Sequence, residues 1–176
     1  MTPPDGLRIE RARPADASAL ARVYVETWRA AYAGLVPDRV LIAMQEPVHE
    51  TRFAGWIGRQ TEKQFILVAH MPAAGPVGLC SAGPARGGPK TDGEIYLLYV
   101  DQDWQNRGVG RSLLRAALHG LRTGGYGRAM LWVLSGNPSR FFYEAVGGVR
   151  AAERTERLWG TDLKETGYIW SDLSEV

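Results

Sequence analysis

Strand-forming residues, a turn with two glycines and an amphipathic helix follow one another directly between residues 94 and 121. Residues 94–100 (E-I-Y-L-L-Y-V) are rich in strand formers. Apolar residues then recur at helical spacing over residues 109–121, and the glycine pair at 124–125 ends the helix. The turn therefore joins a strand to a helix N-terminus, where backbone N–H groups favour anions. We expect it to hold a phosphate-bearing ligand.

The remaining patterns predict a single domain over residues 1–176. Alternation predicts a first strand over residues 7–13, helical spacing predicts a helix from Pro14 to Gly34, and shorter helices begin at Pro37 and Pro47. Further predicted elements are strands over 65–69, 77–81, 128–134, 149–158 and 166–172, a turn or loop over 85–92, and a short aromatic helix between Asn137 and Gly147. This order of elements predicts an α+β (α/β layered) fold, with a mixed sheet covered on both faces.

Composition and charge exclude several classes of protein. Hydrophobic residues make up 45% of the chain and charged residues 23%, as in globular domains. The net charge is +2 and the basic residues are scattered, so nucleic acid is not the expected partner. Cys80 is the single cysteine, and it forms no metal-binding spacing with His49, His70 or His119. Apolar runs such as residues 95–100 are too short to span a membrane. We expect a cytoplasmic protein without a metal or a membrane partner.

The turn itself has the residues that an anion site needs. Gly108 and Gly110 let the backbone approach an anion without a Cβ, and Arg107 and Arg111 add positive charge. A dinucleotide-binding fingerprint would need a third glycine where Leu113 stands, and a P-loop would need a lysine before its serine. Both nucleotide patterns fail, which makes a nucleotide-phosphate enzyme the least favoured alternative.

The pattern Q-x-x-G-x-G after a strand ending in L-Y-V resembles the pyrophosphate loop of the GNAT superfamily of acyl-CoA-dependent N-acetyltransferases. Residues 93–114 and 137–148 (N-P-S-R-F-F-Y-E-A-V-G-G) resemble the two best-marked motifs of that family, in the same order. Residues 27–38 and 168–173 are similar to one bacterial branch of small GNAT proteins. The resemblance thus extends over most of the chain.

The resemblance implies a mixed, mostly antiparallel sheet of six to seven strands flanked by helices, with a V-shaped splay between the 94–100 and 128–134 strands. It further implies that the pantetheine arm of acetyl-CoA lies in this splay, paired with the backbone of Leu98 and Val100. The N–H and C=O groups of an unpaired strand edge need hydrogen-bond partners, and the amides of pantetheine can supply them. The implied acetyl-CoA-binding residues are Leu98, Tyr99, Val100, Gln105, Asn106, Arg107, Gly108, Val109, Gly110, Arg111, Ser112, Asn137 and Tyr143.

Glu94 is the candidate general base. The strand period of two predicts that it shares a face with Tyr96, Leu98 and Val100, and several GNAT enzymes have a catalytic glutamate at this spacing. An alkylammonium of pKa about 10.4 must lose a proton before it attacks, which costs roughly 4–5 kcal/mol near pH 7. The alternative is that Glu94 only satisfies a neighbouring arginine or a backbone group.

Tyr143 matches the family tyrosine that protonates the departing CoA thiolate, and the alternative is that the aromatic run 141–143 belongs to the core. Six residues separate Asn137 from Tyr143, whereas the commoner family pattern has seven. Trp28 and Tyr32 lie four residues apart, on one helical face. They pack in the core or form the wall of an acceptor pocket, which this helix often forms in the family.

These features predict an N-acetyltransferase that moves the acetyl group of acetyl-CoA to a primary amine, by direct attack in a ternary complex. The acceptor is a small molecule or a protein N-terminus, and the protein is a monomer or a homodimer. A non-catalytic acyl-CoA-binding or sensor domain is the alternative. The presence of both Glu94 and Tyr143 favours the enzyme.

Overall fold

The computed structural model describes residues 2–86 and 92–174. One seven-stranded sheet has the order β1-β2-β3-β4-β5-β7-β6. Only the β4–β5 pair is parallel among the pairs described, so the predicted mixed, mostly antiparallel sheet is confirmed. The strands are β1 (Arg8–Arg11), β2 (Phe65–Met71), β3 (Gly75–Pro84), β4 (Asp92–Val100), β5 (Arg128–Leu134), β6 (Val149–Leu158) and β7 (Thr161–Trp170).

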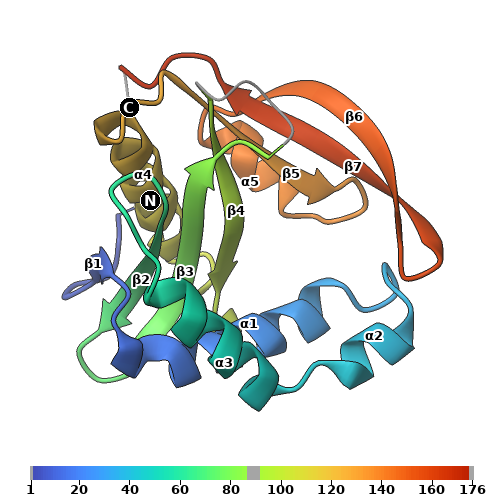
Figure 1. The fold of residues 1–176 in the computed structure, drawn as a ribbon, viewed down its shortest axis with the longest axis horizontal. Coiled ribbons are helices and arrows are strands. Elements are labelled where there is room, and N and C mark those ends of the chain that lie inside the picture. Colours follow the sequence, from blue (N-terminus) through green and yellow to red (C-terminus); the bar gives the residue numbers. More distant parts are fainter. Residues whose placement is uncertain (1, 87–91, 175–176) are drawn as a thin grey trace.

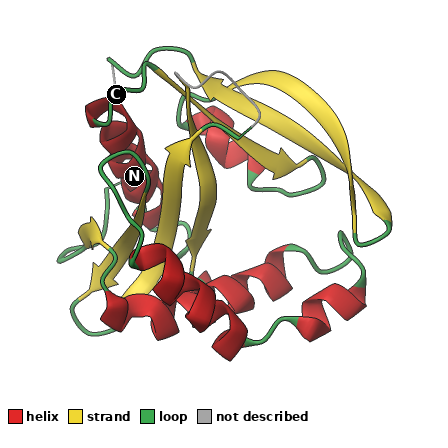
Figure 2. Ribbon diagram, in the orientation of Figure 1, coloured by secondary structure: helices red, strands yellow, loops and turns green. Residues whose placement is uncertain are grey.

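Helices cover both faces of the sheet, as predicted (Figures 1 and 2). One face packs against α1 and α3 through a core that contains Leu20 and Phe53. The other face packs against α4 and α5 through a larger core that contains Leu113 and Tyr143. The helices are α1 (Ala17–Ala31), α2 (Asp38–Ala43), α3 (Glu46–Ile57), α4 (Val109–Thr123) and α5 (Arg140–Ala145).

Strands β4 and β5 separate soon after they pair (Figure 1). Their register pairs Asp92–Glu94 with Arg128–Met130 and extends no further. Beyond these residues β4 continues beside β3, while β5 continues beside β7. Each strand therefore has one edge without a neighbouring strand, and the predicted V-shaped splay is confirmed.

A β-bulge interrupts the pairing of β3 with β4. Ala82 lies opposite Ile95, but the next residue back along β3, Ser81, lies opposite Leu97. Tyr96 is therefore the extra residue, and a bulge leaves such a residue outside the regular ladder. The bulge also reverses the order in which side chains alternate between the two faces.

This reversal corrects the predicted orientation of Glu94. Leu98 and Val100 pack in the core on the α4 side, whereas Leu97 and Tyr99 pack against the α1 and α3 side. Glu94 precedes the bulge and lies with Leu97 and Tyr99 along the smaller pocket described below. The prediction that it shares a face with Leu98 and Val100 was wrong, because regular alternation cannot reveal an inserted residue.

The predicted helices and strands are present in the structure, although the ends of some of them differ. The strands predicted over 128–134 and 149–158 have those bounds in the structure, and the first strand is shorter than the predicted 7–13. The first helix is preceded by a 3₁₀ turn at Pro14–Asp16. The loop predicted after β3 falls largely on residues 87–91, which are outside the described residues.

The last strand begins earlier than predicted. It starts at Thr161, not at residue 166, and forms a hairpin with β6. Trp159 and Gly160 make the turn and both have positive φ, 52° and 78°. Two successive positive φ values match a two-residue hairpin turn whose twist suits the flanking strands. The sequence signal was hidden because tryptophan rarely occupies such a position.

Gly120 on α4 gives the first testable prediction. A Cβ there would lie 2.6 Å from the ring of Phe65, which is buried in the core. Although alanine usually stabilises a helix interior, we expect Gly120→Ala to destabilise the protein by about 1–3 kcal/mol through overpacking. Urea unfolding measures this. The control is Gly55→Ala on α3, whose Cβ would meet only Arg59, at 3.6 Å, and should stabilise by up to about 1 kcal/mol. An unchanged midpoint for Gly120→Ala would contradict the packing argument.

Candidate functional site

A cleft of about 1040 Å³ opens where β4 and β5 diverge. Its walls come from β4, β5, the start of α4, α5 and the C-terminal end of α1. The predicted acetyl-CoA-binding residues that line it are Leu98, Tyr99, Val100, Gln105, Asn106, Gly108, Gly110, Arg111, Asn137 and Tyr143. The structure thus brings together residues from both predicted motifs.

Three of the predicted acetyl-CoA-binding residues do not line the cleft with their side chains. The exposed guanidinium of Arg107 lies 5.3 Å from the ring centroid of Trp104. Val109 is buried in the core under α4. The Ser112 hydroxyl donates a hydrogen bond of 3.1 Å to the carbonyl of Gly108.

The loop at the start of α4 requires glycine for two physical reasons. Gly108 caps the helix with φ of 83°, in the left-handed region, which costs side-chain-bearing residues energy. A Cβ at this position would also lie only 3.1 Å from the Cα of Pro3. Gly110 lines the cleft in the first turn of α4. The free N–H groups of that turn therefore point toward a site that favours an anion.

Two amide side chains hold the walls of the cleft in shape. Gln105 donates through Nε2 to the Val100 carbonyl at 2.9 Å, which ties the loop to the end of β4. The Oδ1 of Asn137 accepts from the backbone N–H of Ser139 at 2.9 Å, and Asn137 is buried. Gln105 and Asn137 both line the cleft. Each side chain also makes a hydrogen bond to the backbone of the protein.

Tyr143 reaches the cleft from α5. Its ring lies against Tyr168, with centroids 5.9 Å apart. Burial, with smaller contributions from Tyr32 and Cys80, raises the pKa of the Tyr143 hydroxyl well above its usual value of about 10. The hydroxyl therefore keeps its proton through neutral and moderately alkaline pH and can serve as a hydrogen-bond or proton donor.

A smaller pocket of about 180 Å³ adjoins the cleft on the α1 side of the sheet. Both predicted acceptor-wall residues line it: Trp28 and Tyr32 have ring centroids 4.3 Å apart, and the Trp28 Nε1 donates to the Tyr99 hydroxyl at 2.9 Å. Seven residues line both the cleft and the pocket, namely Tyr32, Ile95, Tyr96, Leu97, Tyr99, Trp132 and Val133. These shared residues mark the place where ligands of the two cavities would meet.

Glu94 lies along the smaller pocket with only 2% of its surface exposed. Its Oε1 accepts from Nε and Nη2 of Arg86 at 3.1 and 2.6 Å, and its Oε2 accepts from the backbone N–H of Arg86 at 2.7 Å. The arginine and backbone contacts of the alternative interpretation are therefore present. Each carboxylate oxygen can accept more than one hydrogen bond, so Oε2 has capacity for a further donor.

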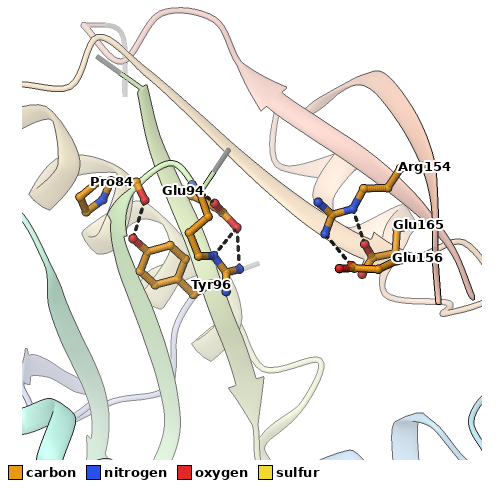
Figure 3. Close-up of polar contacts among 7 residues, drawn as sticks. Pro84, Glu94, Tyr96, Arg154, Glu156 and Glu165 are labelled. Atoms are coloured by element: carbon orange, nitrogen blue, oxygen red, sulfur yellow. Dashed lines mark hydrogen bonds and ion pairs between the residues drawn. The ribbon is translucent and has the colours of Figure 1, made fainter. Parts of the chain in front are cut away.

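Apart from Glu94, sequence reasoning missed the charged residues of this pocket, which are Arg86, Arg154 and Glu165. Arg154 on β6 donates through Nε to Glu165 on β7 at 2.6 Å and through Nη2 to Glu156 at 3.1 Å. Figure 3 shows Glu94 on one side and these three residues on the other. Arg86 follows β3 in a segment without periodicity, so its sequence carried no signal. The hairpin alternation could have found Arg154, had the turn at residue 159 been recognised.

The described residues contain neither a metal-binding cluster nor a membrane-spanning helix. Within residues 2–86 and 92–174, no cluster of three His, Cys, Asp or Glu side chains is arranged to hold a metal ion. In the same ranges no helix combines the length and apolar character needed to cross a membrane.

Comparisons with known proteins agree with the geometry. The Acetyltransferase (GNAT) family model matches residues 21–148. The uncharacterized N-acetyltransferase YuaI of Bacillus subtilis (strain 168) is 32% identical over 169 residues, which cover 96% of this chain and 95% of that protein.

Two solved structures share the fold. Salmonella typhimurium yncA, a putative acetyltransferase with its cofactor acetyl-CoA, matches with a TM-score of 0.75 and 21% identity, covering 98% of this chain and 96% of that chain. PaiA N-acetyltransferase from Thermoplasma acidophilum, in complex with coenzyme A, matches with a TM-score of 0.70 and 19% identity, covering 91% and 97%. Together with the family match over residues 21–148 and the near full-length relative, these findings show that the chain belongs to the acetyltransferase (GNAT) family.

Proposed function

We propose that the protein transfers the acetyl group of acetyl-CoA to a primary amine, by direct attack within a ternary complex. The observation that carries this proposal is the junction of two cavities. The larger cleft contains the anion-favouring loop, the smaller pocket has an aromatic wall, and the two share Tyr32, Tyr96 and Tyr99. Such an arrangement lets two ligands bind at once with their reactive ends in contact.

The cleft fits the chemistry of acetyl-CoA. Gly108 and Gly110 leave room for the pyrophosphate at the N-terminus of α4, and Arg111 lines the cleft beside them. The open edges of β4 and β5 can hydrogen-bond the pantetheine amides. When bound, the thioester supplies an acetyl group whose C–S bond breaks as the C–N bond to the amine forms. The structural neighbours with acetyl-CoA and coenzyme A support this assignment.

Glu94 and Tyr143 divide the proton transfers in this proposal. Glu94 accepts the ammonium proton through a water molecule bound to Oε2. Arg86 holds the Glu94 side chain in place for this step. Tyr143 donates its proton, or a hydrogen bond, to the departing thiolate. Its raised pKa keeps the hydroxyl protonated, so that it can donate a hydrogen bond to the thiolate. Trp28 and Tyr32 form the wall against which the acceptor lies.

Acetyl-CoA binding tests the proposal directly. Isothermal titration of the purified protein should show saturable binding, and Arg111→Glu should weaken it about tenfold or more, because it places a negative charge beside the pyrophosphate. The control is Arg115→Glu, one turn further along α4 on an exposed position, which should change the affinity less than threefold or so. Absence of acetyl-CoA binding at millimolar concentration would refute the proposal. Binding without acetylation of any amine would favour a non-catalytic sensor instead.

A further inference from the structure

Two arginine–glutamate ion pairs line the smaller pocket from different elements. Arg86 pairs with Glu94 at 2.6 Å where β3 leads into β4, and Arg154 pairs with Glu165 at 2.6 Å on the β6–β7 hairpin. In Figure 3 Glu94, the partner of Arg86, lies on one side of the space between β4 and the hairpin, and Arg154 and Glu165 lie on the other. A ligand in this pocket therefore lies between two guanidinium groups.

Both guanidinium groups are oriented by aromatic rings. Arg86 lies 4.5 Å from the ring centroid of Tyr96, and Arg154 lies 4.2 Å from that of Trp132. Stacking on a ring covers one face of a guanidinium and leaves its N–H edge available. The pocket thus holds two pre-oriented donor edges, and a planar acceptor matches such an edge best.

The remaining N–H donors of Arg86 and Arg154 indicate which chemical group a ligand could place beside them. A guanidinium has five N–H donors, and two of them are used by each of Arg86 and Arg154 in the contacts above. Three N–H donors of each guanidinium lie outside these contacts with Glu94, Glu165 and Glu156, and a carboxylate on the ligand can accept hydrogen bonds from them. An ammonium in the same place would add donors only, and would compete with the arginines for Glu94 and Glu165.

The volume of the smaller pocket, and the place where this pocket meets the cleft, limit the size and orientation of the acceptor. The pocket volume of about 180 Å³ admits a compact molecule. Its walls beyond the ion pairs are apolar or aromatic, and they include Trp28, Trp159 and Leu163. The reacting amine must lie at the residues shared with the cleft, such as Tyr32 and Tyr99.

We propose that the acceptor is a free amino acid with a compact, largely apolar side chain, whose carboxylate is bound by Arg86 and Arg154. This inference rests on the proposed acetyl transfer and names its substrate class. Arg86 and Arg154 hold the carboxylate, the aromatic wall holds the side chain, and the amine faces the cleft beside Glu94. The two arginines are specificity-determining residues in this scheme.

Matched acceptors test the proposal. Release of CoA thiol is measured at saturating acetyl-CoA with L-phenylalanine, L-phenylalaninamide and phenethylamine, and in parallel with L-leucine, L-leucinamide and isoamylamine, within a panel of all common amino acids and putrescine. The best free amino acid should exceed both its amide and its decarboxylated analogue in kcat/KM by roughly 10- to 100-fold, as expected for a charged hydrogen-bonding site.

Variants of Arg154 test whether this residue gives the preference for an acceptor with a carboxylate. Arg154→Gln should bring the ratio of amino acid to matched amine close to one while the KM for acetyl-CoA stays unchanged, and Arg154→Lys should keep part of the preference because it keeps the charge. The control is Arg157→Gln on the same hairpin, which loses a pair with Asp162 that is exposed on both sides. It should retain the full preference.

The failures are distinguishable. Equal or faster turnover of the decarboxylated amine or of putrescine would overturn the amino-acid class in favour of simple cationic amines. Amides that match their free amino acids would overturn it in favour of peptide N-termini. Acetyl-CoA binding with no acetylation of any free amino acid would also overturn it. Absence of acetyl-CoA binding would instead refute the proposed acetyl transfer itself.

Discussion

Glu94→Gln should lower kcat near pH 7 by about 10²- to 10⁴-fold, the usual contribution of a general base. The activity should recover partly toward pH 9, because a larger fraction of the acceptor amine is then already deprotonated. The KM for acetyl-CoA should stay nearly unchanged, since Glu94 lies along the smaller pocket. The pH–rate profile at saturating acetyl-CoA measures this. If the variant keeps the wild-type profile, the base assignment is wrong.

A matched variant separates the base from the structural partner. Glu94 also holds Arg86, through two guanidinium hydrogen bonds and one backbone hydrogen bond. Loss of the Glu94 carboxylate therefore removes the proposed base and also disturbs the position of Arg86. Arg86→Gln removes the side-chain partner and leaves the carboxylate. It should raise the KM for an amino-acid acceptor but preserve the pH dependence of kcat. The same pH change in both variants would indicate that Glu94 only positions Arg86.

Tyr143→Phe should lower kcat by about one to two powers of ten, because a thiolate of pKa near 8.5 is already a fair leaving group. The rise of the rate toward alkaline pH should remain, since burial keeps the wild-type hydroxyl protonated over that range. An acetyl thioester with a more acidic thiol should restore much of the lost rate, because protonation of the leaving group then matters less. Stopped-time thiol assays with both thioesters measure this.

Tyr168→Phe is the control for that experiment. Its ring lies beside Tyr143, but its hydroxyl donates to Glu144 at 2.7 Å. The same chemical change on a neighbouring ring should therefore leave kcat within about twofold and cost about 1 kcal/mol of stability. A rate for Tyr143→Phe equal to that of Tyr168→Phe would remove Tyr143 from the proton transfer.

Patterns along the chain predicted the elements and the cleft because these depend on local chemistry. The glycine-bearing turn at residues 105–111 and the aromatic helix at 140–145 each carry their signal within a few residues. The strand predicted over 128–134 also had clear local boundaries. Family resemblance then implied how these segments meet. Ten of the predicted acetyl-CoA-binding residues consequently line one cavity.

The smaller pocket could not be predicted in this way because it depends on the tertiary fold. The bulge at Tyr96 depends on how β3 pairs with β4, and that register reversed the face of Glu94. Arg86 and Arg154 are 68 positions apart in the chain and meet one pocket only through the sheet order. The turn at Trp159 uses a backbone conformation that tryptophan rarely adopts.

The β6–β7 hairpin lines the smaller pocket but, among the described residues, not the larger cleft. It contributes Arg154, Trp159 and Glu165 to the smaller pocket, whereas the described residues that line the larger cleft include none from 149–170. Its tip is anchored to α2, where Arg39 donates to the Trp159 carbonyl at 2.5 Å. Exchange of this one hairpin between relatives should therefore change which amine is acetylated while the binding of the acyl donor is inherited intact.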